Sequence, residues 1–163
     1  SGLMVVAKTQ DAFDVLKKQF QQRTVKKVYI ALAHGEFSKS HDVIDFPIER
    51  TVGGKMAARP KGAEGKKAVT EFEVVQTFHH YTLLRLKLMT GRTHQIRVHL
   101  YAYGNPLVGD TLYRRKKVKP EPLGRVFLHA AELGFSDTHG EWREFISPLP
   151  KKLKTFLKTL KEK

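Results

Sequence analysis

Three stretches of the chain carry apolar residues at the spacing of one helix face. We expect helices over residues 10–24, 92–103 and 151–163. Their apolar faces are, in order, Ala12, Phe13, Leu16 and Phe20; Ile96, Leu100 and Tyr103; and Leu153, Phe156, Leu157 and Leu160. Thr9 belongs to a residue type that caps helix N-termini, and Gly104 is typical of helix ends. Each helix thus has one face suited to a protein core.

Alternating or continuous apolar runs predict strands in most of the remaining chain. These runs cover residues 3–8, 25–33, 41–50, 68–78, 81–89, 124–135 and 141–146. Pro47 confines its run to a sheet edge, and the runs on either side of residues 79–80 form a hairpin. In the run 25–33, Tyr29 points away from the aliphatic face, and Lys27 shares its side.

The order of these elements predicts the fold class. Strands that pair locally, without a strict strand–helix–strand alternation, indicate an α+β domain on a mixed, mainly antiparallel sheet flanked by helices. Neither a repeat nor a linker divides the sequence, so we expect a single domain over residues 1–163. The first six residues read as the middle of a strand, and we expect the chain to be a fragment of a longer one.

The charge balance adds a partner to this picture. The chain has 30 Lys and Arg against 16 Asp and Glu, a net charge of +14, which is typical of domains that bind nucleic acid. Solubility alone is the competing explanation. The absence of cysteine excludes disulfides, thiolate nucleophiles and cysteine-bound metals. We find no signal peptide or membrane-spanning run, and we expect a cytoplasmic protein with no membrane partner.

Two segments concentrate the basic residues. The first, residues 51–67, is rich in glycine and contains Lys55, Arg59, Lys61, Lys66 and Lys67. The second contains Arg114, Arg115, Lys116 and Lys117. Such segments are suited to following a phosphate backbone, and we take these residues as candidate nucleic-acid contacts. A solvated loop without a partner explains the first segment equally well.

Residues 90–100, Thr-Gly-Arg-Thr-His-Gln-Ile-Arg-Val-His-Leu, hold the densest set of polar side chains in the chain. The turn at their start, together with Arg92, could hold an anion at the N-terminus of the second helix. Arg97 lies at the margin of the buried stripe, where a half-desolvated guanidinium needs a carboxylate or phosphate partner. His94 and His99 are five positions apart and do not share a helix face, which disfavours a zinc site.

Several strings along the chain resemble the RluA-type pseudouridine synthase family, whose members isomerise uridine to pseudouridine in RNA. The most specific is Gly-Arg-Thr-His-Gln-Ile-Arg-Val-His-Leu, at residues 91–100. The others lie at residues 1–9, 27–32, 105–110 with Tyr113, and 128–131. They follow the family's order and cover nearly the whole chain. The resemblance implies the pseudouridine synthase core fold, truncated at its N-terminus, with rRNA or tRNA as the partner and no metal or redox cofactor.

The resemblance also implies roles for single residues. Arg97 would keep a nucleophilic aspartate charged inside the closed pocket. Tyr29 would lie against the target base and take part in the proton transfer at carbon, and Leu128 would form an apolar wall. Supporting roles, in ordering the loop or touching RNA, fall to Arg92, His94 and Gln95.

Two departures from the family pattern matter. Asn105 stands where the family usually has histidine, and we attach no function to this change. The nucleophilic aspartate of the family belongs to a motif that ends in Ser-Gly, and this chain begins at that Ser-Gly. We therefore expect the aspartate to lie upstream and the chain alone to be inactive. The alternative is a non-catalytic RNA-binding module with the same fold. Missing strands would leave a sheet edge open to self-association.

Overall fold

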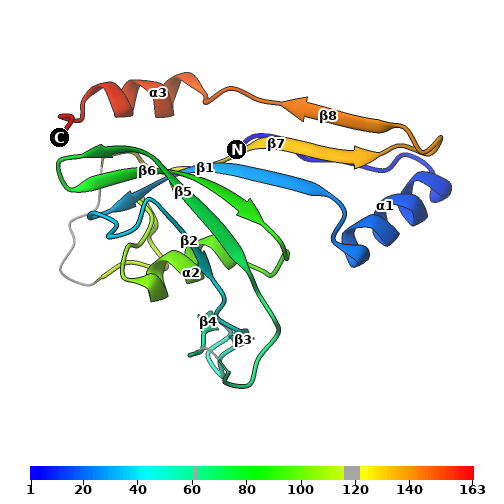
Figure 1. Cartoon of the computed structure of the whole chain (residues 1–163), viewed down its shortest axis with the longest axis horizontal. Coiled ribbons are helices and arrows are strands. Elements are labelled where there is room, and N and C mark those ends of the chain that lie inside the picture. Colours follow the sequence, from blue (N-terminus) through cyan, green and yellow to red (C-terminus); the bar gives the residue numbers. More distant parts are fainter. Residues whose placement is uncertain (61, 116–121) are drawn as a thin grey trace.

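The computed structural model describes residues 1–60, 62–115 and 122–163 (Figure 1). Its helices are α1 (Gln10–Gln22), α2 (Gln95–Tyr103) and α3 (Lys151–Lys158). Its strands are β1 (Lys26–His34), β2 (His41–Ile44), β3 (Ile48–Arg50), β4 (Met56–Ala58), β5 (Thr70–Phe78), β6 (Tyr81–Leu88), β7 (Leu128–Ser136) and β8 (Trp142–Ile146). Local signals set two helix ends as predicted. Thr9 caps α1 by accepting a hydrogen bond from the Ala12 N–H at 3.2 Å, and Gly104 ends α2 in a left-handed conformation.

Six strands form one sheet in the order β2-β5-β6-β1-β7-β8 (Figure 1). Its strand pairs are all antiparallel, and the described residues add one parallel bridge, between Gly2 and Ala130. β3 and β4 form a separate hairpin beyond the end of β2. The predicted α+β class with a mainly antiparallel sheet is confirmed.

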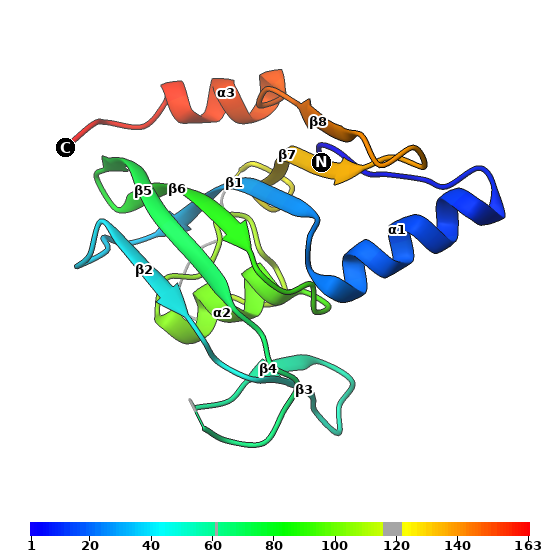
Figure 2. The same ribbon diagram turned by 45° about the vertical axis from the view of Figure 1, so that its right-hand side comes forward.

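The two faces of the sheet carry separate cores, because successive residues of β1 point to opposite sides. On one face, Ala31 packs in a cluster with Leu86 and with Leu100 of α2. On the other face, Leu32 packs in a cluster with Leu153 of α3. Figure 2 shows α2 and α3 on opposite sides of the sheet. The central strand β1 is therefore buried on both faces, which fixes the side chains that it carries.

The predicted strand over residues 3–8 is wrong. The Leu3 N–H donates to the Ala130 carbonyl of β7 at 3.0 Å, but beyond Glu132 the same edge of β7 pairs with β8. Residues 4–8 consequently pair with no strand of the described ranges. Met4 and Val6 are 83% and 70% exposed, instead of buried as their apolar character predicted.

Four other elements differ from their predicted bounds by more than two residues. α2 begins at Gln95 instead of residue 92. α3 ends at Lys158 instead of residue 163, because residues 162–163 pair with the end of β5. β7 begins only at Leu128, because the preceding Phe127 N–H bonds to the Val108 carbonyl at 2.8 Å. Pro47 separates β2, an edge strand, from β3, which pairs with β4. No helix in the described ranges is long and apolar enough to cross a membrane.

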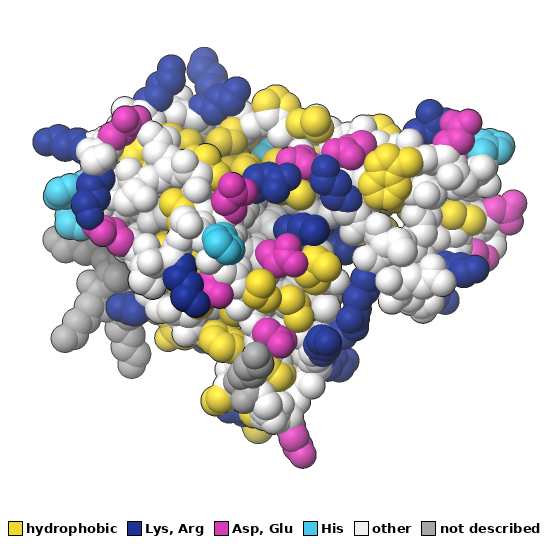
Figure 3. All heavy atoms as spheres, in the orientation of Figure 1, with side chains coloured by type: hydrophobic (Ala, Val, Ile, Leu, Met, Phe, Trp, Pro, Cys, Tyr) yellow, Lys and Arg dark blue, Asp and Glu magenta, His cyan; other side chains and the backbone are white. Residues whose placement is uncertain are grey.

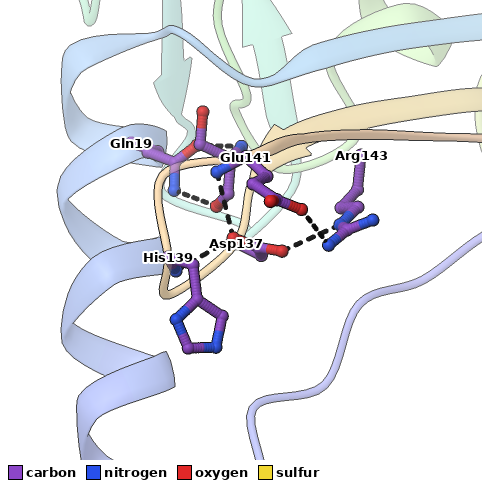
Figure 4. A network of polar contacts seen from close by, with 6 residues as sticks. Gln19, Asp137, His139, Glu141 and Arg143 are labelled. Carbon is purple, nitrogen blue, oxygen red and sulfur yellow. Dashed lines mark hydrogen bonds and ion pairs between the residues drawn. The ribbon is translucent and has the colours of Figure 1, made fainter.

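Side-chain hydrogen bonds fasten α1 to the turn between β7 and β8 (Figure 4). Gln19 donates to the Ser136 carbonyl and accepts from the Ser136 N–H, both at 2.7 Å. Asp137 holds the turn itself by accepting from Arg143 Nε at 2.8 Å and from the Glu141 N–H at 3.1 Å. α1 has no buried residue, so these polar contacts contribute to holding it beside the sheet.

Candidate active site

Tyr29, Arg97 and Leu128 line one pocket, although they come from β1, α2 and β7. The pocket has a volume of about 420 Å³, and Ser1 and Arg125 also line it. β1 and β7 are neighbours in the sheet, which places Tyr29 and Leu128 on adjacent strands. The structure thus brings together the three residues to which the sequence assigned catalytic roles.

Arg97 has a carboxylate partner, which is one of the two kinds of partner that its half-buried position predicted. Its Nε and Nη2 donate to the two carboxylate oxygens of Asp110 at 2.7 and 2.8 Å. The Asp110 side chain is fully buried, and its Oδ1 also accepts from the backbone N–H groups of Leu112 and Tyr113, each at 2.9 Å. This bidentate contact fixes the plane of the guanidinium.

The environment of Asp110 favours its charged form. Burial alone would raise the pKa of the carboxyl, but the hydrogen bonds from Arg97 and from the Tyr113 and Leu112 N–H groups outweigh it. The pKa therefore lies below its ordinary value. Among the described residues nothing accepts a hydrogen bond from Nη1 of Arg97. The guanidinium of Arg97 lines the pocket and also lies over the Tyr113 ring, with its central carbon 5.0 Å from the ring centre.

Tyr29 presents a half-buried phenol to the same pocket. Burial raises the pKa of this phenol, so the hydroxyl stays protonated at neutral pH. Within the described ranges its hydroxyl has no hydrogen-bond partner, so a bound molecule could take one up. The ring, the guanidinium and the apolar Leu128 side chain together suit a flat, polar ligand such as a nucleobase.

The loop before α2 is held by a buried glutamine. Gln95 is 3% exposed, and its Oε1 accepts from Thr90 Oγ1 at 2.7 Å and from the Arg92 N–H at 2.9 Å. Its Nε2 donates to the Val69 carbonyl and to Thr70, each at 3.0 Å. Of the two supporting roles expected for Gln95, loop ordering is the one that these contacts serve.

The two histidines of this stretch have separate partners. His94 adopts a left-handed conformation directly before α2, and its Nδ1 lies 3.1 Å from the Tyr113 hydroxyl. His99 is fully buried between Thr70 Oγ1 and the Phe46 carbonyl, each 2.9 Å away. Burial lowers the pKa of His99, which favours the neutral ring. Across the part of the chain that the structure describes, no group of three potential ligands could hold a metal ion.

Two further pockets extend the site along the surface. The second pocket has a volume of about 690 Å³ and shares Tyr29 with the candidate active site. The third pocket has a volume of about 390 Å³ and shares Gly91 and Arg92 with the second pocket. Figure 3 shows Lys and Arg side chains along the hollow between α1 and the β3–β4 hairpin. Because neighbouring pockets share lining residues, we refer to the three pockets together as the groove, which extends from the candidate active site to residues of β3 and β4.

Most of the described basic residues that were predicted to contact nucleic acid do not line this groove. Most are exposed, namely Lys55, Arg59, Lys66, Lys67, Arg114 and Arg115. Some have protein partners: Arg59 pairs with Glu49, and Arg115 donates to the Gly104 carbonyl at 2.7 Å. Lys61, Lys116 and Lys117 fall outside the described residues. Of the basic residues predicted to contact RNA, only Lys66 and Arg92 line the groove within the described ranges.

Sequence reasoning missed residues whose partners are distant. Asp110 lay in one of the quoted strings, but its pairing with Arg97, thirteen positions earlier, carries no local signal. Lys17, Arg23 and Lys27 line the second pocket and were not predicted. Lys27 had one signal, since it shares a strand face with Tyr29.

Comparison with known proteins gives matches to RNA pseudouridine synthases. The family model described as RNA pseudouridylate synthase matches residues 1–102. An uncharacterized RNA pseudouridine synthase of Chloroflexus aurantiacus is 41% identical over 166 residues, covering 100% of this chain and 51% of the relative. The ribosomal large subunit pseudouridine synthase C of Vibrio parahaemolyticus is 37% identical over 168 residues, covering 99% of this chain and 52% of that relative. The chain spans about half the length of the curated relatives it matches.

Solved structures agree with the sequence relatives. Human RNA pseudouridylate synthase domain containing 1 superposes with a TM-score of 0.78 at 30% identity, over 89% of this chain and 63% of that one. Human RNA pseudouridylate synthase domain containing 4 superposes with a TM-score of 0.77 at 26% identity, over 97% of this chain and 71% of that one. The fold is therefore shared with these domains.

Proposed function

Because the chain belongs to the RNA pseudouridylate synthase family, we propose that the whole protein isomerises uridine to pseudouridine in cytoplasmic rRNA or tRNA. One observation carries the proposal: an aromatic ring, a fixed guanidinium and an apolar wall, from Tyr29, Arg97 and Leu128, meet in one pocket. The reaction breaks the N-glycosidic bond, turns the bound base and rejoins it through carbon. A pocket for it must hold a flat base extruded from its stack.

Each residue then has a stated part in the reaction. The Tyr29 ring stacks against the base, and its protonated phenol lies beside the carbon whose proton is transferred. Leu128 excludes water from the apolar side of the base. Arg97, held by Asp110, presents its Nη1 to a carboxylate nucleophile and keeps that carboxylate charged.

The nucleophile in this proposal is an aspartate that precedes Ser1 in the longer protein, so the 163-residue chain alone is inactive. Among the described residues that line the pocket there is no carboxylate. Asp110 does not serve, because it is saturated by Arg97 and two backbone N–H groups. The twofold length of the relatives leaves room for the missing group.

RNA binding in this proposal uses the groove and the exposed basic residues around it. Arg92 lines two of its pockets, and its Nε donates to the Lys67 carbonyl at 3.0 Å, which positions it at the groove. The net charge of +14 attracts the RNA backbone whatever its base sequence. Sequence choice would then come from the pocket around Tyr29.

The proposal is tested with the longer protein that contains the residues before Ser1. It is incubated with RNA tritiated at uracil carbon 5, and tritium release is followed. Release that depends on the upstream aspartate, and that the 163-residue chain does not give, is expected. If the chain instead binds RNA, and the longer protein releases nothing, the alternative of a non-catalytic RNA-binding module holds.

A further inference from the structure

Lys27 is a buried lysine without an acidic partner. It is 9% exposed, and its Nζ donates to the Val25 carbonyl at 3.1 Å and lies 5.7 Å from the centre of the Phe20 ring. No carboxylate of the described residues pairs with it, whereas the neighbouring Lys26 bonds to Glu132 at 2.9 Å. Burial lowers the pKa of Lys27. A buried, unmatched cation costs free energy unless an anion reaches it.

The pocket beside Lys27 gathers cations from three elements. Lys17 lies on α1, Arg23 directly follows α1, Lys27 lies on β1, and Arg92 lies in the loop before α2. No Asp or Glu of the described residues lines this pocket of about 690 Å³. Four cations in one pocket without a carboxylate form a site for a multiply charged or repeating anion.

The position of the pocket narrows the ligand. Tyr29 lines both this pocket and the candidate active site. An anion bound in this pocket would therefore lie next to a base that contacts Tyr29. In an RNA strand, the anionic groups next to a base are the backbone phosphates. A single carboxylate from elsewhere in the protein would neutralise one of the four cations and leave the others unmatched.

We infer that this pocket binds a backbone phosphate of the RNA beside the target nucleotide, with Lys27 as its buried cation. The inference rests on the proposed function and adds a subsite to it. A phosphate bound in this pocket would align the target base with Tyr29 through the RNA backbone, independently of the base sequence.

The test compares RNA binding by the 163-residue chain and its variants. A short fluorescein-labelled single-stranded RNA is titrated at several salt concentrations, and the melting temperature of each protein is measured without RNA. Lys27→Met replaces the ammonium with an apolar group of similar length. We expect it to weaken RNA binding about tenfold and to reduce the slope of log K against log salt by about 0.7. We expect the melting temperature to rise, because an unmatched buried charge is removed.

A second pair of variants covers the case in which Lys27→Met does not fold. Lys17 lines the pocket, and Lys18, the next residue of α1, is exposed and lines none of the three groove pockets. Lys17→Met should weaken binding and lower the salt slope, and Lys18→Met should change both less. Equal effects of these two variants would overturn the inference.

Other outcomes separate this inference from the proposed function. If the unchanged chain binds RNA and Lys27→Met binds it equally well, the subsite is wrong and the proposed function stands. A higher melting temperature with unchanged RNA affinity would show that the unmatched charge of Lys27 makes no contact with RNA, and would overturn the inference. Full competition by inorganic phosphate, at constant ionic strength and at micromolar concentration, would make the pocket a site for free phosphate and overturn the RNA assignment. Failure of the unchanged chain to bind RNA would count against both.

Discussion

Replacing Asp110 with Asn tests whether the Arg97 contact holds the candidate site together. Asp110→Asn keeps the size of the side chain and removes its charge, while Arg97 keeps a side chain that is 20% exposed. Leaving one partner of a buried ion pair unmatched costs about 3–5 kcal/mol. Because Arg97 is partly exposed to water, we expect a loss of about 2–3 kcal/mol in the free energy of unfolding. For a chain of this size, that corresponds to a melting temperature lower by about 4–12 °C.

The pH dependence of this loss follows from the lowered pKa of Asp110. A carboxyl whose pKa is lower in the folded state stabilises the protein at pH values above its unfolded pKa, which is about 3.9. That stabilisation disappears as the pH falls through the folded pKa. The difference between the two proteins should therefore be largest at neutral pH and shrink below about pH 4.

Urea unfolding at neutral and acidic pH measures both effects. Glu36→Gln is the matched control, because Glu36 pairs with Lys163 at the surface, where an ion pair contributes little. A double-mutant cycle with Arg97→Met should give a coupling energy above about 1 kcal/mol. Equal stability of Asp110→Asn and the unchanged chain at neutral pH, or a coupling energy near zero, would refute the reasoning.

Two further predictions concern the scaffold. Gly109→Ala should destabilise the chain by about 2–4 kcal/mol, because Gly109 has φ +74° and a Cβ would lie 1.9 Å from a backbone oxygen. Gly91→Ala is the control and should change the stability little, because nothing lies within 4 Å of a Cβ there. Equal melting temperatures of the two variants would contradict this prediction. Ile146 is 75% exposed on β8, which among the described strands pairs only with β7. The chain should therefore self-associate in sedimentation equilibrium, and Ile146→Lys should reduce this; a monomeric unchanged chain at high concentration would count against the open edge.

The parts of the fold that sequence predicted well depend on local signals. The cap at Thr9, the turn between β5 and β6 and the glycine after α2 each act within a few residues of the element that they end. The strand predicted over residues 3–8 was wrong because an apolar run needs a neighbour, and β8 occupies the edge where it would pair. Pairing is decided by distant parts of the chain, which a local pattern does not contain.

The candidate site shows the same limit. Position on a helix face predicted that Arg97 needs an anionic partner, and Asp110 is that partner. Which carboxylate would meet it depends on how the loop after α2 folds back. Lys27 was placed on the Tyr29 side of its strand, but its burial depends on Phe20 of α1, which the fold brings above it.

The measurement that tests the central claim most directly is tritium release by the longer protein carrying Tyr29→Phe. This change keeps the ring that stacks on the base and removes the hydroxyl beside the reacting carbon. If the pocket of Tyr29, Arg97 and Leu128 is the active site, release from RNA tritiated at uracil carbon 5 should fall about 100-fold or more, while RNA affinity stays the same. Undiminished release by Tyr29→Phe would contradict the account and place the chemistry elsewhere.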